Sequence, residues 1–264
     1  ASKNFASVTT ICDKKFYNPF IEELTKNKGV TSLAFRRKMA ERNFKLTSDY
    51  DLSIFKWLSN NDDKKNNKKI KIKYGENPNQ KAYFVKSSKS HIFNSQISGK
   101  NIGYNNILDI SEGMSCLNEF AEPTCVIIKH NNPCGVSSSD KIEKAYFKAV
   151  DSDPMSAFGG IVLLNRKVDI KLAKNINGRF FEAVVAPNFD KIALDILKSK
   201  TKLIIINSSN LKEKNKTQFQ SVNSGILYQD INNFKITKSK IRLVSNKKVS
   251  EKKIDDLLFA FKVA

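Results

Sequence analysis

A lysine and a histidine stand side by side at the end of an apolar run in the stretch Cys125–Val136, CVIIKHNNPCGV. Apolar or β-favouring residues precede Lys129 and His130, and Asn-Asn-Pro follows, which predicts a buried strand that ends in a turn. An amine and an imidazole at one strand end could move a proton and stabilise an anion. Alternatively, both are ordinary polar residues of a solvated turn, and this stretch alone does not decide between the two interpretations.

The composition permits a sizeable folded core and points away from a membrane protein. Of the 264 residues, 40% are hydrophobic, and no apolar run approaches the length of a membrane span. The first residues do not resemble a signal peptide. No two of the four cysteines form a C-x-x-C pair, so neither a zinc knuckle nor a redox motif is supported. Scattered cysteines in a chain of this size predict a reducing environment, and we expect a cytoplasmic protein.

A net charge of +20 raises the question of nucleic-acid binding. Only six of the 46 basic residues are arginine, the side chain that forms bidentate contacts with phosphates and bases. The lysines are spread along the chain among asparagines, so a general bias in composition explains the charge more simply than a functional patch. We therefore expect no specific nucleic-acid partner, although anionic small substrates would be attracted. A basic nucleic-acid-binding α/β module is one alternative interpretation.

The first part of the chain predicts one strand and a series of helices. An alternating VTTIC segment predicts the strand, apolar residues at helical spacing predict the helices, and Gly29, Thr31 and Ser48 are placed to end or begin them. The expected elements are a strand at 8–12 and helices at 17–28, 31–44 and 48–60. The segment Asn60–Lys69 contains no apolar residue and predicts a linker.

Beyond the linker, short apolar strands alternate with helices. Gly75 and Asn77-Pro78 predict a turn between two strands, and Asp153-Pro154 predicts the end of a helix. The expected strands lie at 70–86 (two strands), 125–128, 161–164, 180–189, 202–207 and 221–230. The expected helices lie at 111–120, 140–150, 190–198 and 250–264, the last of them capped by Ser250. Because several strands are purely apolar, the pattern predicts an α/β architecture with largely parallel, buried sheets.

Three motifs stand in order along this pattern: YGENPNQ at 74–80, KHNNPCG at 129–135 and DPMSAFGG at 153–160. Together they closely resemble a family of bifunctional purine-biosynthesis enzymes, the phosphoribosylaminoimidazolecarboxamide (AICAR) formyltransferase / IMP cyclohydrolases. The segments ASKNFASVT, GYNNILD, FFEAVVAP, SGILYQD and DDLLFAFKVA agree with the same family. Any one motif would be weak evidence, but all of them in order cover essentially the whole chain.

The resemblance implies two domains. Residues 1–65 resemble the C-terminal part of an IMP cyclohydrolase domain with a methylglyoxal-synthase-like α/β fold. Residues 66–264 resemble the N-terminal part of an AICAR formyltransferase domain, whose family fold is cytidine-deaminase-like. Since both ends of the chain match internal family segments, we expect an internal piece of the enzyme. Such a piece is expected to be inactive alone, and the full-length enzyme to be a homodimer.

The resemblance also implies the chemistry of the lysine–histidine pair. Family members transfer a formyl group from the co-substrate 10-formyltetrahydrofolate to the amine of AICAR, and close the ring of formyl-AICAR to give IMP. That amine is a poor nucleophile, because its lone pair is delocalised, so a general base must take its proton while a cation stabilises the formyl oxyanion. His130 suits the first role and Lys129 the second, and the family places its catalytic pair at these positions.

Several further residues match family positions that contact the substrate. By resemblance, the residues that bind the AICAR nucleotide are Lys73, Tyr74, Asn105, Gly159 and Glu182. Lysine at position 73 replaces the usual arginine, which keeps the charge but loses the bidentate fork. Judged without the resemblance, these side chains also suit simpler roles: a turn for Asn105, a bulge for Gly159 and a surface carboxylate for Glu182.

Lys3 matches the lysine of the family's A-K-N-H segment, which is implied to exchange a proton during ring closure. Two family histidines are replaced in this chain: Phe5 stands at the end of that segment, and Asn79 stands within YGENPNQ. Each change removes a titratable group from a motif of the family. His91 belongs to no motif, and its polar surroundings predict a solvated side chain.

A zinc deaminase of the same fold is the other alternative interpretation. Such an enzyme needs H-x-E followed by P-C-x-x-C. In this chain Asn132 stands two residues after His130, and Cys134 is followed by Gly-Val-Ser. We therefore expect no metal site. The basic nucleic-acid-binding module would instead show a steep salt dependence of DNA affinity and no binding of AICAR.

Overall fold

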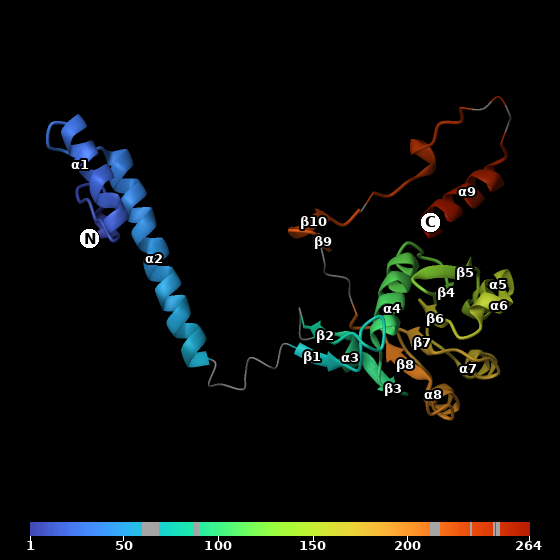
Figure 1. Cartoon of the computed structure of the whole chain (residues 1–264). Coiled ribbons are helices and arrows are strands. Elements are labelled where there is room, and N and C mark those ends of the chain that lie inside the picture. The colour runs from blue at the N-terminus through green and yellow to red at the C-terminus, as the bar shows by residue number, and fades with distance from the viewer. Residues whose placement is uncertain (60–68, 87–89, 212–216, 233, 245, 247–248) are drawn as a thin grey trace. The chain divides into compact units, whose positions relative to one another are not determined.

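The computed structural model describes residues 1–59, 69–86, 90–211, 217–232, 234–244, 246 and 249–264. The chain divides into two compact units, Ala1–Lys68 and Lys69–Ala264 (Figure 1). The linker predicted at 60–69 and the domain boundary predicted after residue 65 lie outside the described residues, apart from Lys69, which begins the second unit.

The described part of the first unit contains helices and no strand. Its elements are the short 3-10 helices η1 (Ser2–Asn4) and η2 (Lys14–Phe16) and the α-helices α1 (Tyr17–Lys26) and α2 (Leu33–Ser59). Helix α1 ends at Lys26 with Asn27 as its C-cap, two residues before the predicted end, and Gly29 lies beyond the cap. The φ of Gly29 is +90°, and its N–H donates to the Leu24 carbonyl at 2.7 Å. The left-handed position directly after the cap, where glycine is usual, is taken by Lys28 with a φ of +54°.

Three predictions for this unit are wrong. The strand predicted at 8–12 is absent from the described structure. The two helices predicted on either side of Ser48 are one helix, α2, because no glycine or proline interrupts it. Its N-terminal cap is Ser32, whose Oγ accepts the Phe35 N–H at 3.2 Å, and not Thr31.

The second unit alternates strands with helices, which confirms the predicted α/β class. Its strands are β1 (Lys69–Ile72), β2 (Ala82–Val85), β3 (Gln96–Ser98), β4 (Thr124–Lys129), β5 (Asn132–Ser138), β6 (Ile161–Leu164), β7 (Ala183–Ala186), β8 (Ile204–Asn207), β9 (Thr217–Val222) and β10 (Gly225–Asp230). Its helices are α3 (Ile92–Ser95), α4 (Tyr104–Leu117), α5 (Ile142–Ser152), α6 (Pro154–Ala157), α7 (Ile170–Asn177), α8 (Lys191–Lys198), η4 (Lys238–Lys240) and α9 (Glu251–Val263).

A mixed sheet of six strands, in the order β3-β8-β7-β6-β4-β5, forms the centre of this unit. The pairs β6–β7 and β7–β8 are parallel, whereas β3–β8, β6–β4 and β4–β5 are antiparallel. The prediction of a largely parallel sheet is therefore wrong. An apolar run indicates burial on both faces of a sheet, but it carries no information about strand direction. The strand β5 is not among the predicted ones, because NPCGVSS has the proline, glycine and serine content of a loop.

Helices cover both faces of the sheet, and alternate residues of each strand point to opposite layers. In β4, Cys125 and Ile127 pack with residues of α5, α7 and α8, whereas Val126 and Ile128 pack with residues of α3 and α4. These four side chains are at most 1% exposed. Burial on both faces explains why the strands appear in the sequence as continuous apolar runs.

Two separate antiparallel ribbons, β1–β2 and β9–β10, complete the strands of the second unit. The strand–turn–strand arrangement predicted at 70–86 is confirmed. The single strand predicted at 221–230 is wrong: the chain reverses at Asn223-Ser224, where Ser224 has a φ of +73°, and a hairpin results. The prediction included the polar residues of this turn in one strand, because the apolar residues that follow them dominate the pattern of the segment.

Caps define where two of the helices begin. Helix α4 begins seven residues earlier than the predicted helix at 111–120, since Asn106 Oδ1 accepts the Gly103 N–H at 3.2 Å within its first turn. Ser250 caps α9 as predicted, with its Oγ accepting the Lys253 N–H at 3.4 Å. Asparagine and serine near a helix start satisfy N–H groups that lack a partner inside the helix.

Candidate functional site

One edge of the six-stranded sheet gathers most of the residues that the sequence singled out. Strand β4 ends where β6, β7 and β8 begin: Ile128 pairs with Ile161, and Ala183 and Ile204 follow in register on the next two strands. We call this end of the sheet the polar edge. It comprises Lys100, Asn105, Asn106, Asp109, Lys129, His130, Asn131, Gly159 and Glu182.

The turn between β4 and β5 consists of His130 and Asn131, whose φ angles are +55° and +61°. Two successive positive φ angles are required by the type I′ turn, which usually contains asparagine and glycine. A histidine in this region is uncommon and strained. Two hydrogen bonds hold the turn: Asp109 Oδ1 accepts the Asn131 N–H at 2.7 Å, and Asn132 Nδ2 donates to the His130 carbonyl at 3.0 Å. His130 is exposed, so a small molecule can reach its imidazole.

Lys129 is held against the loop that precedes β6. Its Nζ donates to the Phe158 carbonyl at 3.0 Å, and an ammonium group has two further N–H groups to offer. Gly159 follows with a φ of +75°, and its N–H donates to the Phe180 carbonyl at 2.9 Å. The rings of Phe158 and Phe180 lie 5.1 Å apart and are 63% and 51% exposed. They border a cavity of about 240 Å³ beside the polar edge.

Glu182 stands immediately before β7. Its N–H donates to the Gly160 carbonyl and its carbonyl accepts the Ile204 N–H, both at 3.0 Å. Its Oε2 accepts hydrogen bonds from Asn106 Nδ2 and Lys100 Nζ, also at 3.0 Å. Burial alone would raise the pKa of this carboxyl, but the two hydrogen bonds and the charge of Lys100 outweigh burial, so the pKa lies below its usual value. The side chain is therefore a fixed carboxylate at neutral pH.

Asn105 connects the polar edge to the turn between β1 and β2. Its Nδ2 donates to the Glu76 carbonyl at 3.4 Å. Lys73 and Tyr74 precede Glu76 in this turn, and Lys73 Nζ lies 5.7 Å from the centroid of the Tyr74 ring. The residues predicted to bind the nucleotide therefore belong to segments that contact one another: the β1–β2 turn, the start of α4, the loop before β6 and the segment before β7.

Lys3 is the one predicted site residue that belongs to the first unit, where it is exposed in η1. Helix α2 holds the backbone around it. Arg36 Nε donates to the Phe5 carbonyl at 3.0 Å, and Asn43 Nδ2 donates to Ser2 Oγ at 2.9 Å. The segment that contains Lys3 is therefore fixed on the helix surface, although Lys3 itself faces solvent.

The sequence did not single out several residues that organise the polar edge. Asn106 could have been found, because an asparagine three residues after Gly103 is placed to cap a helix. The hydrogen bond between Asn106 and Glu182 could not have been predicted from the sequence, since the two residues are 76 positions apart. Asp109 stands at the end of the GYNNILD segment and Lys100 lies outside the quoted segments. Neither was a predicted site residue, because their contacts with the β4–β5 turn and with Glu182 depend on the tertiary fold.

His91 is not the solvated residue that the sequence predicted. Its side chain belongs to the core on the α4 face of the sheet and is 8% exposed, with the ring centroids of Phe84 and Phe93 at 5.9 Å and 6.2 Å. Burial, together with the positive charge of Lys86, lowers its pKa. Among the residues that the structure describes, none forms a hydrogen bond with its Nδ1. Polar neighbours in sequence misled the prediction because apolar neighbours in space surround the ring.

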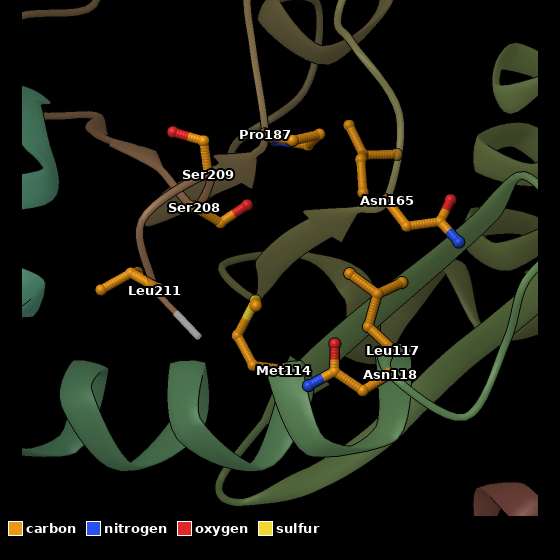
Figure 2. A pocket seen from close by; sticks show the side chains of 9 residues that line it. Met114, Leu117, Asn118, Asn165, Pro187, Ser208, Ser209 and Leu211 are labelled. Atoms are coloured by element: carbon orange, nitrogen blue, oxygen red, sulfur yellow. The ribbon is translucent and has the colours of Figure 1, made fainter. Parts of the chain in front are cut away.

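A second cavity, of about 420 Å³, lies at the opposite end of the sheet, where β6, β7 and β8 end (Figure 2). We call it the carboxyl-edge cavity. Its lining is uncharged and consists of Met114, Leu117, Asn118, Leu164, Asn165, Pro187, Ser208, Ser209 and Leu211. Asn165 already serves the fold: its Oδ1 accepts the Thr124 N–H at 2.8 Å, and its Nδ2 donates to the Glu122 carbonyl at 2.7 Å. None of the predicted site residues lines this cavity.

Within the described ranges, no group of three or more histidine, cysteine, aspartate or glutamate side chains is arranged to hold a metal ion. No helix in the described part of the chain is long and apolar enough to cross a membrane. All four cysteines are free thiols, and burial with the nearby charge of Glu119 raises the pKa of Cys116 to about 11.

The fold and the polar edge define an α/β protein with a mixed, buried sheet and a hydrogen-bonded cluster of charged and amide side chains at one end of it. Comparison with known families adds the particular family. The model of the AICARFT/IMPCHase bienzyme family matches residues 1–264. The chain belongs to this family, and the resemblance inferred from its motifs is confirmed.

Individual relatives are similar along the whole chain. It is 42% identical over 280 residues to the bifunctional purine biosynthesis protein PurH of Caldicellulosiruptor bescii, with 100% of this chain and 54% of the relative covered. The PurH proteins of Persephonella marina and Bacteroides thetaiotaomicron are 40% and 37% identical, again over 100% of this chain and over 54% and 52% of their own lengths. The chain therefore spans about half the length of the curated relatives it matches.

Proposed function

We propose that the polar edge is part of a site that transfers a formyl group from 10-formyltetrahydrofolate to the amine of AICAR. Residues 66–264 then supply the N-terminal part of an AICAR formyltransferase domain. Residues 1–65 supply the end of an IMP cyclohydrolase domain, which closes formyl-AICAR to IMP. Membership of the bienzyme family and likeness to proteins named for purine biosynthesis support both activities.

The observation that carries the proposal is the convergence of distant segments at the polar edge. Lys129 ends β4, and His130 begins the turn that follows it. Gly159 lies in the loop before β6, and Glu182 lies before β7. Asn105 and its neighbour Asn106 open α4 and connect this edge to the β1–β2 turn and to Glu182. A cation, an imidazole, a carboxylate and amide groups thus lie around one strand end, which is the set of groups that amine acylation requires.

In the proposed reaction, the AICAR amine attacks the formyl carbon and a new C–N bond forms. His130 accepts the proton that the amine loses. The bond between the formyl carbon and N10 of the folate then breaks, and His130 returns the proton to that nitrogen, so that tetrahydrofolate leaves neutral at N10. Lys129 Nζ, fixed by the Phe158 carbonyl at 3.0 Å, stabilises the negative charge on the formyl oxygen between these two steps.

The nucleotide-binding residues have complementary chemistry in this proposal. Lys73 offers a point charge to the phosphate. The carboxylate of Glu182 accepts an N–H group of the substrate, and Asn105 can both donate and accept. Gly159 presents backbone without a side chain, so that the substrate can approach closely. Tyr74 contributes a ring beside Lys73.

Ring closure is assigned to the first unit. The carboxamide nitrogen of formyl-AICAR attacks the formyl carbon, and water is lost as the ring forms. We propose that Lys3 exchanges a proton in this step. The support is the match of Lys3 to the family's A-K-N-H segment and its exposure on a segment fixed by α2.

The decisive experiment is His130→Ala in the complete polypeptide encoded by the gene. Formyl transfer is expected to fall about 10²- to 10⁴-fold, the usual contribution of a positioned acid–base group. Formation of IMP from added formyl-AICAR is the internal control and should keep its wild-type rate. Equal loss of both activities in a folded variant, or undiminished formyl transfer, would contradict the assignment of His130.

We also propose a homodimer that acts in the cytoplasm. The β9–β10 ribbon supports the dimer, because Phe219, Ile226, Leu227 and Tyr228 are each at least 60% exposed, and exposed apolar clusters commonly mark interaction surfaces. The free cysteines support a reducing compartment. Sedimentation velocity of the complete gene product tests the assembly: a dimer is expected at micromolar concentration, and a monomer would refute it.

A further inference from the structure

We infer that Asp109 is a positioning residue for His130, an inference that rests on the formyl transfer proposed above. Its carboxylate reaches from α4 to the turn between β4 and β5, where Oδ1 accepts the Asn131 N–H at 2.7 Å. The donor belongs to the peptide unit that joins His130 to Asn131. The hydrogen bond therefore fixes the backbone from which the imidazole projects, and Asp109 acts through His130 without contacting the reacting atoms.

The turn needs such a support because it contains no glycine. Both His130 and Asn131 have positive φ angles, a conformation that costs free energy for residues with a side chain and persists where surrounding contacts impose it. One support comes from within the hairpin, where Asn132 Nδ2 donates to the His130 carbonyl at 3.0 Å. Asp109 supplies the support from outside the hairpin. Because its carboxylate is a charged acceptor, this hydrogen bond is of the stronger type.

Helix α4 is a rigid base for this support. Ile110, next to Asp109, is 2% exposed in the core, and Leu117 is 3% exposed. Gly113 lies so close to the sheet that an added Cβ atom would come within 2.5 Å of Leu163 Cδ1. A side chain carried by a tightly packed helix can hold a neighbouring group within the narrow limits that catalysis needs.

The role predicts a particular pattern of kinetic loss. If Asp109 orients the imidazole, its removal lowers kcat for formyl transfer and leaves the KM for AICAR nearly unchanged, because the predicted nucleotide contacts are made by other side chains. A small displacement of a reacting group can cost about 10²-fold in rate. We therefore expect Asp109→Ala to lower kcat about 10²-fold while KM changes less than about threefold.

Two further variants separate orientation from general stability. Asp109→Asn keeps an oxygen that can accept the Asn131 N–H as a neutral bond, and we expect it to retain kcat within about tenfold of wild type. Glu112→Ala, on the same helix and exposed, is the matched control and should leave formyl transfer unchanged. Hydrogen exchange of the Asn131 amide should accelerate in Asp109→Ala and stay slow in Asp109→Asn.

A double-mutant cycle with His130→Ala in the complete gene product gives the sharpest test. Once the imidazole is absent, Asp109→Ala should lower the residual rate less than about twofold, because residues that act as a unit are not additive. Full, multiplicative losses would overturn the inference, as would wild-type activity of Asp109→Ala. Should that variant fail to fold, Asp109→Ser, whose short hydroxyl cannot span the same distance, takes its place in the cycle.

Failure of this inference differs from failure of the proposed function. If His130→Ala abolishes formyl transfer while the Asp109 variants remain fully active, the positioning role alone is refuted. If His130→Ala leaves formyl transfer intact, the proposed function is refuted, and the role of Asp109 with it.

Discussion

The strands β6, β7 and β8 begin at the polar edge and end at the carboxyl-edge cavity, yet the two ends of the sheet are built differently. At the polar edge the side chains are charged and held: Glu182 accepts two hydrogen bonds at 3.0 Å, and Lys129 is fixed by a backbone carbonyl. The carboxyl-edge cavity has a volume of about 420 Å³ and is lined by uncharged side chains. Among its polar side chains, Asn165 is already bound to the backbone of the fold.

The proposed function thus places the reaction at the polar edge, and not at the cavity of about 420 Å³. Ligands of open α/β sheets usually bind outside the carboxyl ends of parallel strands, where the order of strands reverses. Here β6, β7 and β8 follow one another without such a reversal. Strand β4 runs antiparallel to β6, so its own carboxyl end, with Lys129 and His130, lies at the amino ends of the parallel strands. The direction of β4 thus determines at which end of the sheet Lys129 and His130 lie.

A large difference in activity is expected between variants at one residue from each edge. Lys129→Met keeps the apolar stem but removes the cation proposed to stabilise the formyl oxyanion, and we expect kcat for formyl transfer to fall about 10²- to 10³-fold. Ser208→Ala, at the carboxyl-edge cavity, should change kcat less than about twofold. Steady-state assays of both variants in the complete gene product provide the comparison. Similar losses in the two variants would show that both edges take part in the reaction.

Much of the fold could be predicted because buried strands have a recognisable apolar pattern in the sequence. The apolar segments of β4, β6, β7 and β8 are strands as expected, since a strand buried on both faces needs apolar side chains at every position. The apolar pattern does not indicate strand direction, and the prediction of a largely parallel sheet was wrong. That error has a functional consequence, because a β4 parallel to β6 would place Lys129 and His130 at the cavity edge.

The candidate site was predictable only in part, for a different reason. Motifs pointed to Lys129, His130 and Glu182, and these residues do lie at one edge of the sheet, although their roles stay predictions. The residues that hold them were not among the predicted site residues, although Asp109 and Asn131 lie in the GYNNILD and KHNNPCG segments. Asp109 and Asn131 are 22 positions apart, and their contact arises only when α4 packs beside the β4–β5 turn. Supporting residues of this kind follow from the tertiary fold and not from local pattern.

A smaller effect tests whether the polar edge is an ionic network that the cavity edge lacks. The unfolded chain has a Glu182 pKa near 4.5, and the folded protein has a lower one, because the hydrogen bonds and the Lys100 charge outweigh burial. A depressed carboxyl pKa means that ionised Glu182 stabilises the folded state above about pH 4.5. This stabilisation is lost as the pH falls through the folded-state pKa.

Glu182→Gln should therefore lower the free energy of unfolding by about 1 kcal/mol at pH 7, since the pair with Lys100 is partly exposed and solvent weakens it. The deficit should shrink as the pH falls below about 4.5, where the wild-type carboxyl also becomes neutral. Urea unfolding of the wild type and the variant across this range measures it. Glu112→Gln makes the same change of charge at an exposed position of α4 and should show almost no deficit at any pH. A deficit for Glu182→Gln that stays constant with pH would mean that the shape of the side chain, and not its charge, holds this part of the polar edge together.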